Sequence, residues 1–343
     1  MRIAVDVMGG DRGPAEAVAG ACKALEENLL ITQVLLVGQP ATIKSALCAH
    51  AETDRLRIVP AADVLTMDNK PVETLRRKKD TSIARAVALL KEGEADALVS
   101  PGNTGGIVAA ATLGLRTIEG IDRPALAAVI PAPANEFLLL DAGANVECKP
   151  AHLAQFAVLG NTYATEVQGK TQPRVGLLNV GSEDVKGTEM IREAHQLCRG
   201  LNLNFVGNLE GRDLFSNHAD VVVTDGFTGN IALKTTEGTV KLFGHFLKEA
   251  LSASPLAKLG AMLARSALNT FKMRVDPRRY NGAMFLGLNG ICIKSHGGSD
   301  AFGFAHAIDV AIELISNDFN ESIKNEYAQL SSDPGFSMKA VVG

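Results

Sequence analysis

The 343-residue sequence has no tryptophan and only three tyrosines. Aromatic platforms on which nucleobases could stack are therefore scarce, which argues against the RNA-binding modules that depend on them. The net charge of −4 argues against general nucleic-acid binding as well. We expect no nucleic-acid partner.

Metal and export patterns are missing too. The five cysteines are an odd number without a Cys-x-x-Cys pair, and no His-Glu-x-x-His motif or His/Cys cluster occurs. Reduced thiols in a cytoplasmic protein without a bound metal or other cofactor fit best. The start, Met1-Arg-Ile-Ala-Val-Asp6, becomes acidic too early for a secretory signal. No apolar run approaches the ~18 residues of a spanning helix, which leaves attachment to a membrane surface open.

Glycine is abundant, with 33 residues, and much of it lies in six loops that each follow a short apolar run. The loops are Asp6–Asp11, Ser100–Gly106, Asp141–Asn145, Asn179–Gly187, Thr224–Asn230 and Ser295–Asp300. In an open α/β sheet, loops leaving the carboxyl ends of strands meet at one edge, where ligands bind. Glycine lets backbone N–H groups approach an anion, and a helix N-terminus favours negative charge. Together the loops predict a composite site for a phosphate-like anion.

Short apolar runs alternate with helix-like stretches along most of the chain. Strands are expected at Arg2–Val7, Gln33–Val37, Leu56–Val59, Asp96–Ser100, Val175–Asn179, Leu203–Val206, Val221–Thr224 and Ile291–Lys294, and Leu126–Ile130 with Phe137–Leu140 favours a hairpin. Helices are expected at Ala15–Asn28, Pro40–His50, Asp80–Glu92, Pro150–Gln168, Thr188–Arg199 and Ser299–Glu326, with another ending at Leu115. Asp63–Lys79 reads as an exposed excursion. The alternation predicts an α/β fold: a three-layer α/β/α sandwich with a mostly parallel sheet.

Residues 229–275 differ from the rest. A long helix over Gly229–Leu251, a break at Ser252–Pro255 and a second helix over Leu256–Phe271 predict a helical hairpin standing off the sheet. Between Lys241 and Arg279 the sequence has eight basic residues and only two acidic ones, although the protein as a whole is acidic. We expect a single domain over residues 1–331 that includes this hairpin, and a loosely held tail over 332–343.

Taken in order, the loops resemble those of the PlsX family of bacterial phosphate acyltransferases. The resemblance spans nearly the whole chain and rests on Asp6-Val-Met-Gly-Gly-Asp11, Gly102-Asn-Thr-Gly105, Asp141-Ala-Gly-Ala-Asn145, Lys186-Gly187, Asp225-Gly-Phe-Thr-Gly-Asn230 and Ser295-His-Gly297. Pro101 and Gly106 depart from it, since alanine is expected at both. The resemblance implies a homodimer with a fold related to phosphotransacetylases and isocitrate dehydrogenases.

The resemblance also implies an activity: transfer of a long-chain fatty acyl group from acyl carrier protein to inorganic phosphate, giving acyl phosphate for phospholipid synthesis. Bound phosphate would attack the thioester directly, without a covalent acyl-enzyme. The implied partners are acyl carrier protein, inorganic phosphate and a downstream glycerol-3-phosphate acyltransferase. The implied location is the cytoplasm, with peripheral contact at the inner face of the cytoplasmic membrane.

Four residues are candidates for the chemistry. Lys186 could neutralise phosphate or polarise the thioester carbonyl, or it could be a solvated lysine paired with Glu183. Asn230 could donate to phosphate or to the oxyanion, and Asp225 could orient Lys186, although an Asx turn and helix cap would suit the same spacing. His296 could protonate the departing thiolate or be structural.

A larger set is expected to bind phosphate or substrate: Gly9, Gly10, Gly102, Asn103, Thr104, Gly105, Asn145, Gly187, Gly226 and Gly229. Thr104 could instead cap a helix, and Asn145 could close the turn after Gly143. A covalent acyl-cysteine at Cys148 or Cys292 is disfavoured, because no adjacent base would activate either thiol.

The basic hairpin allows three interpretations that need not exclude one another. Its cations could dock the acidic acyl carrier protein, its apolar tip could enter a membrane interface, or its helices could form a dimer interface. The candidate residues are Lys248, Leu256, Leu259, Arg265, Lys272, Arg274, Arg278 and Arg279.

Three other functions compete with the acyltransferase. A classical NAD-dependent dehydrogenase is disfavoured, because Met8-Gly-Gly-Asp-Arg-Gly13 is not a strict Gly-x-Gly-x-x-Gly. A coenzyme A-dependent enzyme like phosphotransacetylase is harder to exclude. A non-enzymatic sensor of phosphate or acyl ligands ranks last, since six such loops exceed what a simple binder needs.

Overall fold

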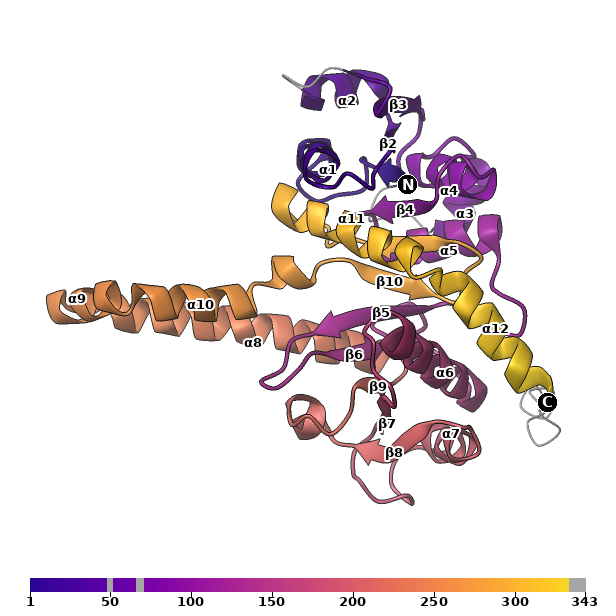
Figure 1. The fold of residues 1–343 in the computed structure, drawn as a ribbon, viewed down its shortest axis with the longest axis vertical. Helices are drawn as coiled ribbons and strands as arrows, with labels where there is room; N and C mark the ends of the chain where they lie inside the picture. The colour runs from indigo at the N-terminus through magenta and orange to yellow at the C-terminus, as the bar shows by residue number, and fades with distance from the viewer. Residues whose placement is uncertain (48–51, 66–70, 333–343) are drawn as a thin grey trace.

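A computed structural model describes residues 1–47, 52–65 and 71–332. Its centre is one sheet of eleven strands, ordered β3-β2-β1-β4-β11-β10-β5-β6-β9-β7-β8, with helices on both faces (Figure 1). The three-layer α/β/α fold predicted from the alternation of strands and helices is therefore confirmed.

The sheet has two parts whose strands run in opposite directions. In the first part five strands are mutually parallel: β1 (Arg2–Asp6), β2 (Gln33–Gly38), β3 (Leu56–Pro60), β4 (Ala97–Ser100) and β11 (Ile291–Lys294). In the second part four strands are parallel to one another: β6 (Phe137–Leu140), β9 (Val221–Val223), β7 (Arg174–Leu178) and β8 (Asn204–Leu209).

Two strands join these parts. β10 (Ala283–Leu286) is antiparallel to both β11 and β5 (Ala125–Ile130), and β5 is antiparallel to β6. The hairpin of β5 and β6 was expected, whereas β10 was not. Its four residues lie between Gly282 and Gly287, which both have positive φ, so the apolar run is too short to stand out in the sequence.

Most helices cover one face of the sheet. They are α1 (Pro14–Glu27), α2 (Pro40–Leu47), α6 (Pro150–Glu166), α7 (Glu189–Arg199), α11 (Ala301–Ser316) and α12 (Phe319–Ser332). The other face carries α3 (Pro71–Arg77), α4 (Ser82–Lys91), α5 (Thr104–Leu115) and the first turns of α8 (Gly226–Ser252). Each face of the sheet thus has its own buried core.

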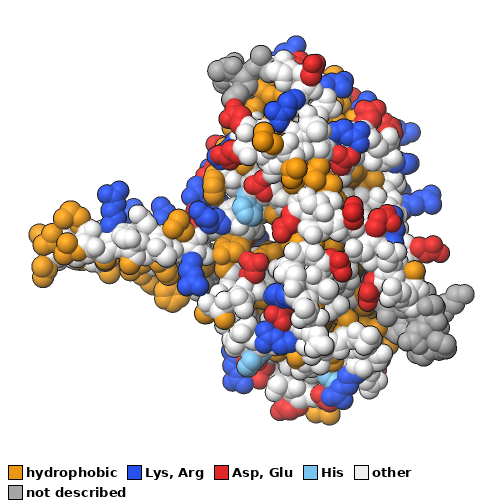
Figure 2. Space-filling view, in the orientation of Figure 1, with side chains coloured by type: hydrophobic (Ala, Val, Ile, Leu, Met, Phe, Trp, Pro, Cys, Tyr) orange, Lys and Arg blue, Asp and Glu red, His pale blue; other side chains and the backbone are white. Residues whose placement is uncertain are grey.

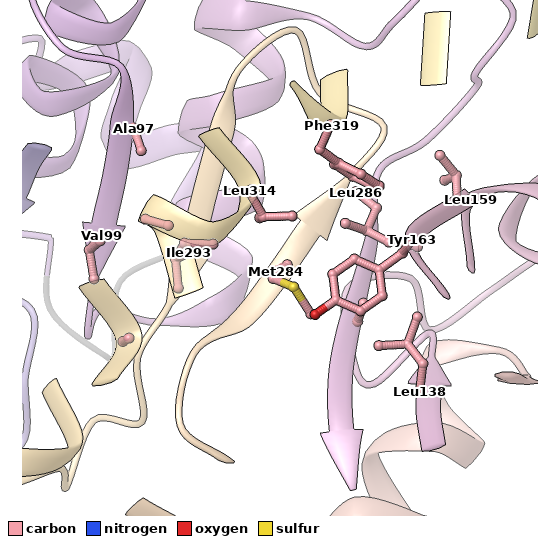
Figure 3. Close-up of a cluster of buried hydrophobic side chains, with 14 of the residues drawn as sticks. Ala97, Val99, Leu138, Leu159, Tyr163, Met284, Leu286, Ile293, Leu314 and Phe319 are labelled. Carbon is pink, nitrogen blue, oxygen red and sulfur yellow. The ribbon is translucent and has the colours of Figure 1, made fainter. Parts of the chain in front are cut away.

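The core over the middle of the sheet is made of aliphatic and aromatic side chains from distant parts of the chain. Figure 3 shows Ile293 of β11, Met284 and Leu286 of β10 and the ring of Tyr163 gathered beneath α11 and α12. The rings of Tyr163 and Phe319 meet edge to face, 5.8 Å apart between centroids. These contacts hold β10 in place although its own sequence is short.

Several predicted boundaries need correction. The excursion over Asp63–Lys79 contains α3, whose Leu75 is buried against the body. The last helix is two helices, because the chain turns at Asp318, which has a φ of 46°. The long helix begins at Gly226 rather than Gly229, since Asp225 is its N-cap. His50 and nearly all of the tail 332–343 lie outside the described residues.

The helical hairpin is confirmed, and we call residues 226–275 the arm. It consists of α8, α9 (Pro255–Leu263) and α10 (Arg265–Val275), so its returning half is two helices rather than one. Figures 1 and 2 show the arm projecting from the body, with hydrophobic side chains at its tip. Within the described residues, no helix combines the length and apolar character needed to cross a membrane.

Candidate functional site

The six glycine-rich loops form two clusters. Loops 6–11, 100–106 and 295–300 follow the neighbouring strands β1, β4 and β11, and we call them the first cluster. Loops 141–145, 224–230 and 179–187 follow the neighbouring strands β6, β9 and β7, and form the second cluster. Because β6 runs antiparallel to β11, the clusters lie at opposite ends of the strands. The expectation that all six loops meet at one edge is therefore wrong.

Helix α8 connects the two clusters. It begins within the second cluster, where Gly226 donates its N–H to Asn145 (2.7 Å). Two turns later, the charge of Lys234 helps to lower the pKa of both Lys294 and His296 in the first cluster. The candidate residues are thus divided between two places that one helix spans.

Close backbone packing builds the first cluster. A Cβ atom on Gly9 would lie 2.5 Å from the Cα of Gly102, so these two loops can touch only through glycine. Asp11 donates its N–H to the carbonyl of Gly297 (2.8 Å), which ties the loop after β1 to the loop after β11. Gly9 therefore has a structural reason to be glycine, whatever it binds, whereas the nearest neighbour of a Cβ on Gly102 would be the Ser100 hydroxyl at 3.1 Å.

A buried carboxyl group lies beneath this cluster. Ser100 donates its hydroxyl to Asp6 (2.7 Å between Oγ and Oδ2), and Met8 donates its N–H to the other carboxyl oxygen (3.2 Å). Burial raises the pKa of Asp6, although these hydrogen bonds oppose the shift. Asp6 thus links β1 to β4 from below, as a structural element of the site.

The N-terminus of α5 belongs to the same cluster. Asn103 is its N-cap and accepts the N–H of Gly106 (3.1 Å), so the capping role considered for Thr104 belongs to Asn103. Thr104 and Gly105 form the first turn, where backbone N–H groups have no partner inside the helix. The geometry is therefore compatible with an anion at this end of the helix.

Lys294, the last residue of β11, was missed in the sequence. Its ammonium donates to the carbonyl of Pro101 (3.4 Å between Nζ and O) and to that of Ser295. Burial lowers the pKa of Lys294 to about 8, with Asp11 and Asp6 opposing the shift and Lys234 adding to it. The sequence does contain a signal for Lys294: it is a lysine at the end of a buried strand, directly before Ser295-His-Gly297.

His296 follows at the rim of the first cluster and is exposed. Its Nδ1 accepts the N–H of Gly298 (3.0 Å), which assigns the proton of the neutral ring to Nε2. Partial burial and the charge of Lys234 lower the pKa of His296. The neutral ring can present an N–H donor, but at neutral pH it holds no extra proton to release.

In the second cluster, the protein's own carboxylate occupies the glycine-rich loop. Asp141 is fully buried and accepts the N–H groups of Gly143 (3.0 Å), Ala144 (2.9 Å) and Asn145 (2.7 Å). It also accepts from the backbone of Leu126 (3.0 Å) and the amide of Asn145 (2.8 Å). Burial raises the pKa of Asp141 against these donors. The backbone N–H groups of this loop, which resembles an anion site, are therefore already bound by a carboxylate of the protein itself.

The start of α8 packs tightly against that loop. A Cβ on Gly229 would lie 1.9 Å from the carbonyl oxygen of Asp141, and one on Gly226 would lie 2.6 Å from that of Asn145. Asp225 caps the helix by accepting the N–H and the hydroxyl of Thr228, both at 2.8 Å. These contacts give both glycines, Asp225 and Asn145 structural roles; binding of substrate by them stays a prediction.

Lys186 and Asn230 are the second cluster's remaining candidates. Lys186 is exposed in its loop, and its carbonyl accepts from Asn179 (3.1 Å) beside Gly187, which has a φ of 90°. The side chain of Asn230 lies against Gly143. Because β7 and β9 are adjacent, both residues stand at the same end of the sheet.

The cysteine thiols near the two clusters are poorly suited to act as nucleophiles. Burial raises the pKa of Cys148 and Cys292 to about 12, which leaves almost no thiolate at neutral pH. Among the described residues, no group of three or more His, Cys, Asp or Glu side chains is placed to hold a metal ion.

Basic residues at the base of the arm and just after it are engaged with the body. Arg278 pairs with Asp276 (2.6 Å) and with Asp300 (2.8 Å), the N-cap of α11. Arg274 donates to the carbonyl of Pro133 (3.4 Å), and Arg278 and Arg279 both lie over the ring of Phe302. Lys248, Arg265 and Lys272 are exposed further out.

Comparison with known proteins gives a consistent result. A family model described as "Fatty acid synthesis protein" matches residues 1–322. The chain is 47% identical over 331 residues to the "Phosphate acyltransferase" of Paramagnetospirillum magneticum, covering 96% of this chain and 94% of the relative. It is 47% identical over 333 residues to the enzyme of the same name from Desulfitobacterium hafniense, covering 97% and 99%.

Solved structures show the same fold. A phosphotransacetylase from Streptococcus pyogenes aligns with a TM-score of 0.60 and 19% identity, over 92% of this chain and 94% of that one. A branched-chain phosphotransacylase from Enterococcus faecalis aligns with a TM-score of 0.58 and 15% identity, over 92% and 99%. At such low identity these likenesses concern the fold alone.

Proposed function

The chain belongs to the fatty acid synthesis protein family and is a phosphate acyltransferase, and from this premise we propose that its acyl donor is a long-chain acyl thioester of acyl carrier protein. The product is acyl phosphate, supplied to a downstream glycerol-3-phosphate acyltransferase. The proposal is supported by the near-complete coverage of this chain by relatives named phosphate acyltransferase, together with the match to a family described as a fatty acid synthesis protein.

The reaction we propose is direct. An oxygen of phosphate attacks the thioester carbonyl carbon, the C–S bond breaks, and the carrier leaves as a thiolate that takes up a proton. Phosphate is itself a nucleophile and a thioester is already activated, so the protein's tasks are to hold phosphate, align it and stabilise the oxyanion. The high pKa of Cys148 supports a route without an acyl-cysteine.

We assign roles by chemistry. Lys186 polarises the carbonyl or neutralises phosphate, since it is an exposed cation in a loop of the second cluster. Asn230 donates to the oxyanion, and Asp225 orients its neighbours while it caps α8. His296 donates a hydrogen bond from its Nε2–H to the departing sulfur, and the thiolate takes its proton from solvent. No metal or other cofactor is part of the proposal.

The arm is proposed to bind three larger partners: a membrane surface, a second copy of this chain and the acyl carrier protein. Its tip exposes Leu256 (78%), Leu259 (49%) and Leu263 (78%), beside the cations Lys258 and Arg265, which suits an anionic membrane surface (Figure 2). Exposed apolar side chains along α8, among them Phe243 and Phe246, suit a homodimer interface. The outer cations Lys248 and Lys272 suit the acidic carrier protein. A location in the cytoplasm, partly on the inner face of the membrane, would follow.

The test is to incubate the protein with palmitoyl-acyl carrier protein, with and without inorganic phosphate, and to trap acyl phosphate with hydroxylamine. We expect acyl hydroxamate that depends on phosphate, with an equal amount of free carrier thiol. Product from palmitoyl-coenzyme A but not from the carrier thioester would replace the donor. Phosphate binding without product from either donor would favour a sensor.

A further inference from the structure

In loops 141–145 and 224–230 of the second cluster, most backbone donors are already engaged within the protein. The third loop, 179–187, has N–H groups without an acceptor among the described residues, at Gly181 and Ser182, but it carries Glu183 and Asp184 directly after them. In the second cluster, Asp141 takes the N–H groups of Gly143, Ala144 and Asn145. The N–H of Gly226 goes to Asn145, and that of Thr228 goes to Asp225. An incoming anion would have to displace a buried carboxylate that already receives five hydrogen bonds, and that carboxylate would also repel it.

In the first cluster, several backbone N–H donors are not engaged by the described part of the protein. Among the described residues, no group accepts the backbone N–H of Gly9, Gly10, Thr104 or Gly105. These four N–H groups come from two loops that touch where Gly9 meets Gly102. All four residues are at least partly exposed, so solvent and solutes can reach them.

Lys294 supplies the positive charge at this place. Its ammonium is bound to the carbonyls of Pro101 and Ser295, so it lies between the loops after β4 and β11. An ammonium has three donors, and these two carbonyls engage two of them. Lys234 and Lys241 of α8 lie near enough to His296 to influence it, and both add positive charge to the same region.

Three carboxyl groups oppose these cations. Asp11 lies at the edge of the cluster, and Asp6 lies beneath it with its carboxyl bound by Ser100 and Met8. Glu237 is paired with Lys234 (2.9 Å). The three cations Lys294, Lys234 and Lys241 are thus matched in number by three carboxyl groups, but Asp6 lies beneath the cluster and Glu237 is already paired with Lys234. An oxyanion that enters the cluster would therefore meet Lys294 and the backbone N–H groups first.

We infer that the phosphate co-substrate binds in the first cluster, with Lys294 as its cationic ligand and the loops after β1 and β4 supplying backbone donors. This inference rests on the proposed function for the identity of the anion, and it extends that proposal in two ways. It adds a residue to the reaction, and it revises the role of Lys186. Phosphate and the carbonyl carbon that it attacks then lie at the opposite end of the strands from Lys186, which is left to hold the carrier or the acyl chain.

Calorimetric titration with inorganic phosphate tests the inference without any acyl donor. Lys294→Gln, which removes the charge but keeps a polar side chain that can donate hydrogen bonds, should raise the dissociation constant for phosphate by on the order of 10- to 100-fold. Lys91→Gln removes an exposed lysine of α4 and is the matched control, with the dissociation constant unchanged. Lys186→Gln should also leave phosphate binding within about twofold of wild type while it slows turnover.

The possible outcomes distinguish a failure of this inference from a failure of the proposed acyl donor. If acyl-carrier turnover fails but phosphate binds and Lys294→Gln abolishes the binding, the site is right and the donor is wrong. If turnover proceeds and a folded Lys294→Gln variant keeps the wild-type dissociation constant and KM for phosphate, the inference is overturned. A wild-type protein that binds no phosphate overturns it as well.

A second variant covers the case in which Lys294→Gln does not fold. Because the pKa of Lys294 is about 8, its charge is present below that pH and lost above it. The wild-type KM for phosphate should therefore rise as the pH passes about 8, whereas Lys294→Arg, which does not titrate there, should give a flat profile. Parallel profiles for the two proteins would contradict the assignment.

Discussion

Gly9 and Gly102 lie in direct backbone contact, and a Cβ atom on Gly9 would come within 2.5 Å of the Cα of Gly102. Rotating a side chain cannot relieve this clash, because the position of a Cβ is fixed by its own backbone and the atom that it meets belongs to the backbone of Gly102. The contact joins the loops after β1 and β4, so it sets the geometry of the first cluster.

Replacing Gly9 by alanine should therefore separate the two loops. We expect the free energy of unfolding to fall by about 1–3 kcal/mol and the KM for phosphate to rise, with the KM for the acyl donor less affected. Urea denaturation and steady-state kinetics would measure both. Gly211→Ala, at a position with open space around its missing Cβ, is the control and should leave both quantities near wild type.

Asp225 has a structural role that can be separated from a catalytic one. Asparagine caps helices about as well as aspartate, so Asp225→Asn should keep the melting temperature of the protein. If the carboxylate also takes part in the reaction, kcat should fall by tenfold or more in that variant. Wild-type kcat together with wild-type stability would limit Asp225 to capping α8.

Membrane contact by the arm can be tested at its tip. Leu259→Glu places a negative charge among exposed apolar side chains, and we expect it to weaken binding to vesicles rich in phosphatidylglycerol by at least severalfold. Leu29→Glu makes the same change at an equally apolar residue of the body, 87% exposed, and serves as the control. Equal flotation of wild type and both variants would rule out the tip as a membrane anchor.

Asp220 gives a prediction about pH. Burial alone would raise the pKa of Asp220, but hydrogen bonds from Arg174 (2.9 Å) and Lys170 (3.0 Å) outweigh it and lower the pKa to about 2. A carboxylate with a lowered pKa stabilises the fold above its unfolded pKa, near 3.8, and that contribution is lost as the pH falls toward 2.

Asp220→Asn should accordingly lower the free energy of unfolding by about 1–3 kcal/mol at pH 7. The difference from wild type should shrink as the pH falls from about 4 toward 2. Urea titrations at several pH values would measure it. A difference that is constant across this range would show that the charge of Asp220 is not what stabilises the fold.

Much of the fold is visible in the sequence because local patterns determine it. Caps and apolar runs identified most strands and helices, and Thr81 and Thr188 cap the helices α4 and α7 as their positions suggest. The direction of a strand leaves no such pattern. The reversal between β5 and β6 was expected as a hairpin, yet its effect on where the later loops lie depends on the position of β10, which was missed.

The candidate site was harder to predict for a related reason. A glycine that allows two backbones to touch and a glycine that receives an anion look the same in a sequence. Gly226 and Gly229 prove to be packed against Asn145 and Asp141. Lys294 was overlooked because it ends a buried strand. Its lowered pKa comes from burial and from charged residues that are distant in the sequence, so the residues next to it in the chain do not reveal it.

Helix α8 has 27 residues without a break, about 40 Å at 1.5 Å per residue. Its first turn is fixed to Asp141, Lys234 lies near the first cluster, and its far end carries the tip of the arm. A continuous helix of this length moves largely as one rigid body. The chain between the tip of the arm and the turns that carry Asn230 and Lys234 is therefore one unbroken helix, without a flexible joint that would absorb a force applied at the tip.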